Sequence, residues 1–156
     1  MSDAVATVSK IVSSEKKAED VKLLPANEEA EQSLLGALLL DNRLIENVSD
    51  FLQPAHFYQP VHGRIYEMIA KAVDHGQVAD IVTLKNIFDK DDDLAHVGGS
   101  QYLTDLVANV VTTVSVQHYG QVIYELFLRR ELISVGREVM QDAYDDEIDK
   151  TASDQI

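Results

Sequence analysis

The chain has 156 residues, 46% of them hydrophobic, and it carries 27 acidic against 13 basic residues. This length and composition fit one globular domain with its own core. The net charge of -14 repels a phosphate backbone, so we expect no direct binding to nucleic acid or to an anionic membrane. The absence of cysteine excludes disulfides, thiolate zinc sites and cysteine nucleophiles. No apolar run predicts a membrane span or a signal peptide.

Residues 1–22 are predicted to form a flexible tail. The segment Ser13 to Asp20 is rich in Ser, Glu, Lys, Ala and Asp and has no aromatic residue. Such a segment buries too little apolar surface to offset the entropy of ordering it. Val5, Val8 and Val12 fall at helical spacing, so a short docking helix is the alternative.

The first helix is predicted to begin after Asn27, which is a good N-cap. Glu28, Glu29 and Glu31 follow in its first turn, where the helix dipole favours negative charge. Its apolar residues recur at helical spacing: Ala30, Leu34, Ala37 and Leu38. They predict a helix that is buried on most sides and ends near residues 41–42. A shorter second helix is expected over residues 43–51.

The middle of the chain predicts three further helices. Pro60 suits the first turn of the third helix, which we expect to end at Gly76. Thr83 is the expected cap of the fourth helix, and residues 89–93 are expected to form a solvated acidic loop. Gly98 and Gly99 should break the chain before a fifth helix that carries Leu103, Leu106, Val107 and Val110.

The last element is a long helix, predicted from about Val116 to Tyr144 after a linker in which Ser115 is the cap. The length of this helix, roughly 43 Å, exceeds what a domain body of this size can cover, so we expect the helix to project beyond the body. A following antiparallel helix, a second copy of the chain, or both must cover its apolar stripe. We expect the sequence to stop at Ile156 inside that following element. Nothing predicts a sheet, so the fold class is all-α.

No motif for catalysis is found. The chain has no GxxxxGK[ST] phosphate loop and no glycine-rich dinucleotide fingerprint. The histidines at positions 56, 62, 75, 96 and 118 include no pair at helical metal-binding spacing. We therefore expect no catalytic, cofactor-binding or metal-binding residue, and we expect His62 to cap or line the start of its helix. Gly120 and Gly136 lie inside the long helix, where either tolerance or close approach of another helix would explain them.

The segment of residues 24–36, LPANEEAEQSLLG, closely resembles the opening of the N-terminal domain of DnaB-type bacterial replicative DNA helicases. Further matches keep the order and spacing of that family. They are Phe57-Tyr58 with Pro60, His62 and Ile65-Tyr66; Asp80-Ile-Val-Thr-Leu84; Val97-Gly-Gly99 with Tyr102-Leu103; and Tyr119 with Val122-Ile123, Glu125 and Arg129-Arg130-Glu-Leu-Ile133. The resemblance covers residues 23–156.

This resemblance implies a helical head over residues 23–113 and, over 114–156, the first arm of a helical hairpin whose second arm is truncated. In that family the hairpins pair, and the domains form a collar of dimers on a cytoplasmic, hexameric helicase. The collar docks primase, and a helicase loader is a further candidate partner. ATP and Mg²⁺ are expected only in a separate motor domain, which unwinds DNA.

The same resemblance suggests residues for the two contacts. The candidates for primase docking, or for the packing behind the docking surface, are Tyr102, Ile133 and Val139. The candidates for pairing of the hairpins are Tyr119, Ile123, Leu126, Arg130, Ile133 and Met140. Tyr102 and Ile133 could equally be ordinary core residues.

Two other functions remain open at this point. The chain could be a free-standing helical adaptor or dimerisation protein derived from the same domain. It could also be an unrecognised enzyme that uses carboxylates and His62, although no convergent set of side chains in the sequence supports this.

Overall fold

The computed structural model of the chain describes residues 23–110 and 115–145. Within these ranges all regular structure is helical, which confirms the predicted all-α class. The predicted tail, the linker residues 111–114 and the predicted start of a second arm lie outside the described residues. Across the described part of the chain, no helix is long and apolar enough to cross a bilayer.

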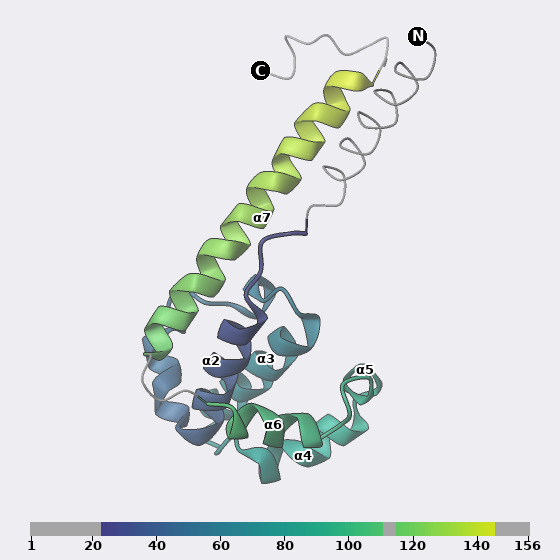
Figure 1. Cartoon of the computed structure of the whole chain (residues 1–156). Coiled ribbons are helices and arrows are strands. Elements are labelled where there is room, and N and C mark those ends of the chain that lie inside the picture. The colour runs from purple at the N-terminus through teal and green to yellow at the C-terminus, as the bar shows by residue number, and fades with distance from the viewer. Residues whose placement is uncertain (1–22, 111–114, 146–156) are drawn as a thin grey trace, which may run out of the picture.

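The described helices form a compact head and one projecting arm (Figure 1). In chain order they are α2 (Glu28–Leu40), the 3₁₀ helices η1 (Asn42–Asn47) and η2 (Pro54–His56), α3 (Pro60–Asp74), α4 (Ile81–Lys90), α5 (Asp92–Ala95), α6 (Gln101–Ala108) and α7 (Val116–Tyr144).

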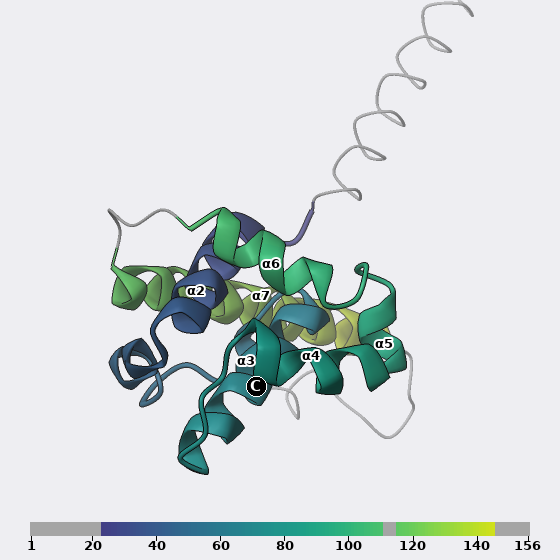
Figure 2. The same cartoon turned by 90° about the horizontal axis from the view of Figure 1, so that it is seen from below.

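Helix α2 is the centre of the head and packs against α3, α6 and α7, as the view in Figure 2 shows. Its start is as predicted, because the Asn27 side chain accepts a hydrogen bond from the Ala30 N–H at 3.0 Å. Leu34, Leu35 and Leu38 are fully buried. Burying one such side chain contributes about 1.5–3 kcal/mol, so α2 holds the head together.

The second predicted helix is wrong in type and length. The Asp41 carboxylate accepts the Arg43 N–H at 3.1 Å and starts a 3₁₀ helix that ends at Asn47. The Asn42 side chain fixes the backbone at the start of this 3₁₀ helix through three hydrogen bonds. Its side-chain amide donates to the carbonyls of Leu38 at 2.8 Å and Ala79 at 2.7 Å, and its side-chain oxygen accepts the Ala79 N–H at 2.8 Å. These bonds tie the end of α2 to the segment before α4.

Two local predictions around α4 also need correction. Asp80, rather than Thr83, is the N-cap, and the two residues form a reciprocal capping box with bonds of 2.8 and 2.9 Å. The segment predicted as an acidic loop is largely helical, because α4 continues to Lys90 and α5 begins at Asp92. Gly98 and Gly99, with φ of 97° and 66°, then break the chain before α6 as predicted.

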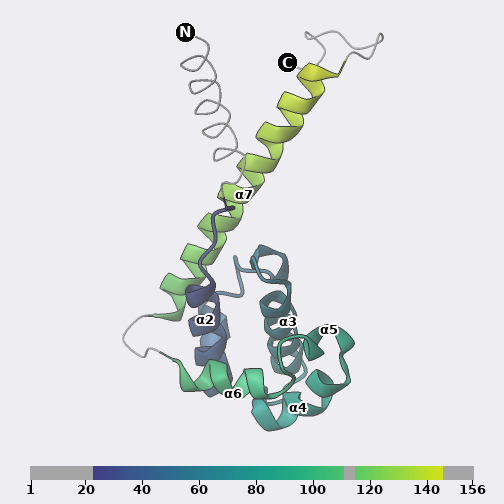
Figure 3. The same cartoon turned by 45° about the vertical axis from the view of Figure 1, so that its right-hand side comes forward.

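Helix α7 has the predicted extent of 29 residues, and Ser115 caps it by accepting the His118 N–H at 3.2 Å. Its first half packs on the head, where Val116 and Ile123 are buried. Gly120 is also buried there. The helix is so close to the head at this point that a Cβ on Gly120 would lie 2.6 Å from a methyl carbon of Val48. The outer half of α7 projects past the head (Figures 1 and 3).

Candidate protein-docking site

From Leu126 to Met140, α7 presents two apolar faces instead of the single stripe predicted. Leu126, Ile133 and Met140 recur every seven residues and share one face. A second face consists of exposed residues at four- and three-residue spacing, which are Leu128, Leu132, Val135 and Val139. Ile133 and Val139 are six residues apart, so they lie about 120° apart around the helix. One partner cannot cover both faces of the arm equally.

The candidate pairing residues divide along the length of α7. Met140 is 56% exposed, and Ile133, Leu126 and Tyr119 are half-buried, so all four remain accessible to a partner to some degree. Ile123 is only 2% exposed because it lies in the core of the head. It therefore cannot contact a second chain as predicted, and its packing seats α7 on the head.

Arg130 lies where α7 leaves the head, and its contacts are within the chain. Its two terminal nitrogens donate to the carbonyl oxygens of Pro25 and His56, both at 2.8 Å. Its guanidinium carbon also lies 5.4 Å from the centre of the Tyr58 ring. Burial, and then the nearby Arg130 charge, lower the pKa of the His56 imidazole below its ordinary value. Arg130 thus fixes the base of the arm to the head rather than projecting from the arm.

Glu31 is the centre of a buried polar network that the sequence did not predict. Its carboxylate is 2% exposed. The carboxylate accepts the backbone N–H groups of Tyr58 at 2.6 Å and Gln59 at 3.3 Å, and it lies 2.5 Å from Nδ1 of His62. Because a buried carboxylate is costly unless it is hydrogen-bonded, these three contacts account for its presence in the head.

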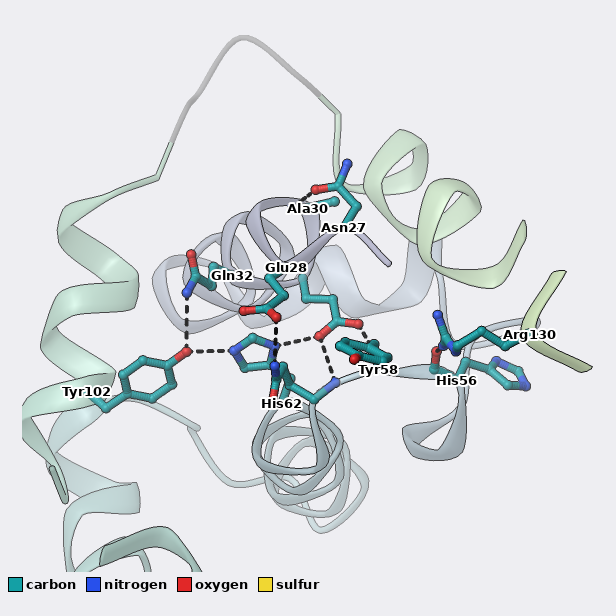
Figure 4. Close-up of polar contacts among 11 residues, drawn as sticks. Asn27, Glu28, Ala30, Gln32, His56, Tyr58, His62, Tyr102 and Arg130 are labelled. Carbon is teal, nitrogen blue, oxygen red and sulfur yellow. Dashed lines mark hydrogen bonds and ion pairs between the residues drawn. The ribbon is translucent and has the colours of Figure 1, made fainter. Parts of the chain in front are cut away.

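The network continues from His62 to Tyr102 on α6 (Figure 4). Nε2 of His62 lies 2.6 Å from the Tyr102 hydroxyl oxygen, and the two rings are nearly parallel with centroids 6.0 Å apart. The same hydroxyl accepts a bond from the Gln32 amide at 3.4 Å. Burial raises the pKa of the Tyr102 hydroxyl above its ordinary value. Tyr102, predicted as a docking residue, is therefore half-buried, with its polar end held inside the head.

The sequence contained one signal for this network. Glu31 precedes Leu34, Leu35 and Leu38 by three, four and seven residues, so it lies on the buried face of α2. A charge on a buried face implies a hydrogen-bonding partner elsewhere in the chain. The prediction from the helix dipole accounts for Glu31 only by its place in the first turn and leaves its place on the buried face unexplained. His62 lines the start of its helix, as expected, but it faces Glu31 and not solvent.

The network offers no site for catalysis. His62 is 1% exposed, and the carboxylate of Glu31 accepts its bonds from groups of this chain. Such a pair cannot reach a substrate without unfolding of the head. Among the described residues, no group of three or more histidine, aspartate or glutamate side chains could hold a metal ion. The burial of His62 and Glu31 therefore argues against a catalytic role for this pair.

Residues 23–125 match the family model of the DnaB-like helicase N terminal domain. Over 135 residues the chain is 38% identical to the replicative DNA helicase DnaB of Rickettsia felis, with 86% of this chain and 27% of that helicase covered. It is 34% identical over 135 residues to the replicative DNA helicase DnaC of Bacillus subtilis, with 85% of this chain and 30% of that helicase covered. The chain thus spans less than a third of the length of these curated relatives.

Solved structures give the same result. The N-terminal domain of DnaB helicase from Mycobacterium tuberculosis matches with a TM-score of 0.73 and 34% identity, over 79% of this chain and 89% of that one. A DnaB-like replicative helicase, whose structure is described together with its interactions with primase, matches with a TM-score of 0.62 and 31% identity, over 74% of this chain and 27% of that one. The resemblance in the sequence is thereby confirmed, and the chain belongs to the family of DnaB-like helicase N-terminal domains.

Proposed function

We propose that this chain is the collar domain of a replicative DNA helicase, which joins copies of itself through α7 and docks primase. The observation that carries the proposal is the projecting half of α7 with its two apolar faces. Leu132 is 72% exposed, Val139 61% and Met140 56% in the isolated chain. An exposed apolar surface of this kind marks an interaction site.

Two faces about 120° apart allow two different contacts at one time. The face with Leu126, Ile133 and Met140 is proposed to pair with the arm of a second copy. The face with Leu128, Leu132, Val135 and Val139 is then open to the hairpin's second arm or to primase. Dimers formed in this way would build the hexameric collar.

Primase is the second proposed partner, and a structural neighbour supports this choice. That neighbour is a DnaB-like replicative helicase whose structure is described with its interactions with primase. The docking candidates in this chain are Tyr102 on α6 and Val139 on the second face of α7, whereas Ile133, on the pairing face, is proposed to support docking through the packing behind it. A helicase loader is proposed as a further partner whose contact surface is not assigned.

In this proposal the chain itself has no catalytic role. ATP hydrolysis with Mg²⁺, and with it DNA unwinding in the cytoplasm, belongs to the motor part of the helicases that this chain resembles. With a net charge of -14, the collar would not contribute direct binding to DNA.

The docking assignment predicts a loss of affinity in two variants. Tyr102→Ala and Ile133→Asn should each weaken binding to the C-terminal domain of the cognate primase by about tenfold or more. The first removes an aromatic contact of the kind that dominates interfaces, and the second puts a polar side chain into the packing behind the docking surface. Isothermal titration calorimetry measures the affinity, and circular dichroism checks that each variant is folded.

Ile87→Asn is the matched control, since Ile87 is 56% exposed on α4, away from the arm. It should bind primase as the unmodified chain does. Equal affinity of the folded Tyr102 and Ile133 variants and the control would show that the docking residues are assigned incorrectly.

A further inference from the structure

The polar contacts around Glu31 form a path that crosses three helices of the head. The path begins on α6, where the Tyr102 hydroxyl oxygen lies 2.6 Å from Nε2 of His62 on α3. It passes through Nδ1 of His62, 2.5 Å from the carboxylate of Glu31 on α2. The other oxygen of that carboxylate accepts the Tyr58 N–H at 2.6 Å. Figure 4 shows these contacts as a continuous row of dashed lines.

The path reaches α7 through the ring of Tyr58. The N–H of Tyr58 is held by Glu31, and its ring lies under the guanidinium of Arg130, at 5.4 Å. Arg130 itself donates to the carbonyls of Pro25, just before α2, and His56, at the end of η2. A shift of the Glu31 carboxylate would therefore move Tyr58, which is part of the seat on which Arg130 rests.

The two ends of this path are the two elements that carry the docking candidates. Tyr102 is itself a candidate, and Ile133 lies three residues after Arg130, about one turn further along the arm. The middle of the path is almost inaccessible to solvent, since Glu31 is 2% and His62 1% exposed. Hydrogen bonds in such surroundings are electrostatically stronger than in water and can support one another.

We infer that Glu31, His62 and Arg130 are positioning residues, which hold the Tyr102 ring on α6 and the base of the α7 arm in one fixed relation. Their role in docking rests on the proposed function, whereas the coupling itself is a property of the head. A change confined to the Tyr102 hydroxyl is then felt at Tyr58 and Arg130, on the opposite side of α2 and α3.

Nuclear magnetic resonance on the chain tests the coupling without any partner. Tyr102→Phe removes only the hydroxyl, and amide hydrogen exchange reports the bonds that Tyr58 and Gln59 donate to Glu31. We expect exchange at the Tyr58 amide to accelerate at least about threefold, and the Arg130 Nε–H resonance to shift.

Tyr124→Phe is the matched control for this measurement. Tyr124 is half-buried on α7 and has ring contacts with Phe51, His56 and Phe127. It should leave the Tyr58 exchange rate unchanged. If the changes caused by Tyr102→Phe are confined to α6 and the side chain of His62, the inference of a coupled path is overturned.

A double-mutant cycle with the C-terminal domain of the cognate primase tests the role in docking. Tyr102→Phe and Arg130→Lys should each weaken binding. The loss of affinity in the double variant should be at least about twofold smaller than the product of the two single losses. A loss in the double variant equal to the product of the two single losses would show that Tyr102 and Arg130 contribute independently, and would overturn the positioning role. If the unmodified chain fails to bind primase, the proposed docking function is wrong, and the exchange measurement alone decides whether the path exists.

Discussion

Glu31→Ala is expected to lower the free energy of unfolding by about 3–5 kcal/mol, the usual cost of removing one partner from a buried, hydrogen-bonded pair. The substitution leaves the N–H groups of Tyr58 and Gln59 and one ring nitrogen of His62 without their shared acceptor. Urea unfolding followed by circular dichroism measures the change.

Two variants keep this experiment specific. Glu29→Ala removes an exposed carboxylate from the same helical turn and should cost less than about 1 kcal/mol. Glu31→Gln retains one oxygen acceptor, so its loss in the free energy of unfolding should lie between those of Glu29→Ala and Glu31→Ala. Equal losses for Glu29→Ala and Glu31→Ala would mean that Glu31 acts only through the helix dipole, as its place in the first turn suggested.

Gly36→Ala should destabilise the head by about 1–3 kcal/mol, although alanine favours helix more than glycine does. At this point α2 and α6 are too close for a side chain. A Cβ on Gly36 would overlap the Leu106 carbonyl oxygen and lie 2.5 Å from a methyl carbon of Val110. Because one of the overlapping groups is backbone, a rotamer change cannot relieve the clash.

The same substitution at Gly136 is the control and should have the opposite sign. A Cβ there meets nothing within 4 Å, so Gly136→Ala should stabilise α7 by about 0.5–1 kcal/mol. Urea unfolding at two protein concentrations separates this effect from association of the arm. A stabilising Gly36→Ala would contradict the close packing of α2 against α6.

Features set by local chemistry were predictable from the sequence. Asn27 and Ser115 cap α2 and α7 as expected, since an N-cap depends on residues only three positions apart. The length of α7 followed from an uninterrupted helical pattern. The predicted cap of α4 was wrong because Asp80 and Thr83 both have capping side chains, and the sequence alone did not decide which of them is the N-cap.

Features that depend on distant residues were not predictable in this way. Arg130 bonds to carbonyls 105 and 74 positions earlier in the chain, so its place at the base of the arm could not follow from helical spacing. Ile123 and Met140 belong to one continuous helix, yet the head covers only the first. Where the head ends along α7 depends on the packing of α2, η1 and η2, which no pattern within α7 encodes.

Hydrogen exchange with mass spectrometry, on the chain alone and with the C-terminal domain of the cognate primase, shows whether the projecting part of α7 is the interaction surface. Primase should slow exchange in residues 128–145 and around Tyr102, while α4 and α5 exchange as before. Slowed exchange confined to α3, α4 and α5, with residues 128–145 unaffected, would contradict docking on α7.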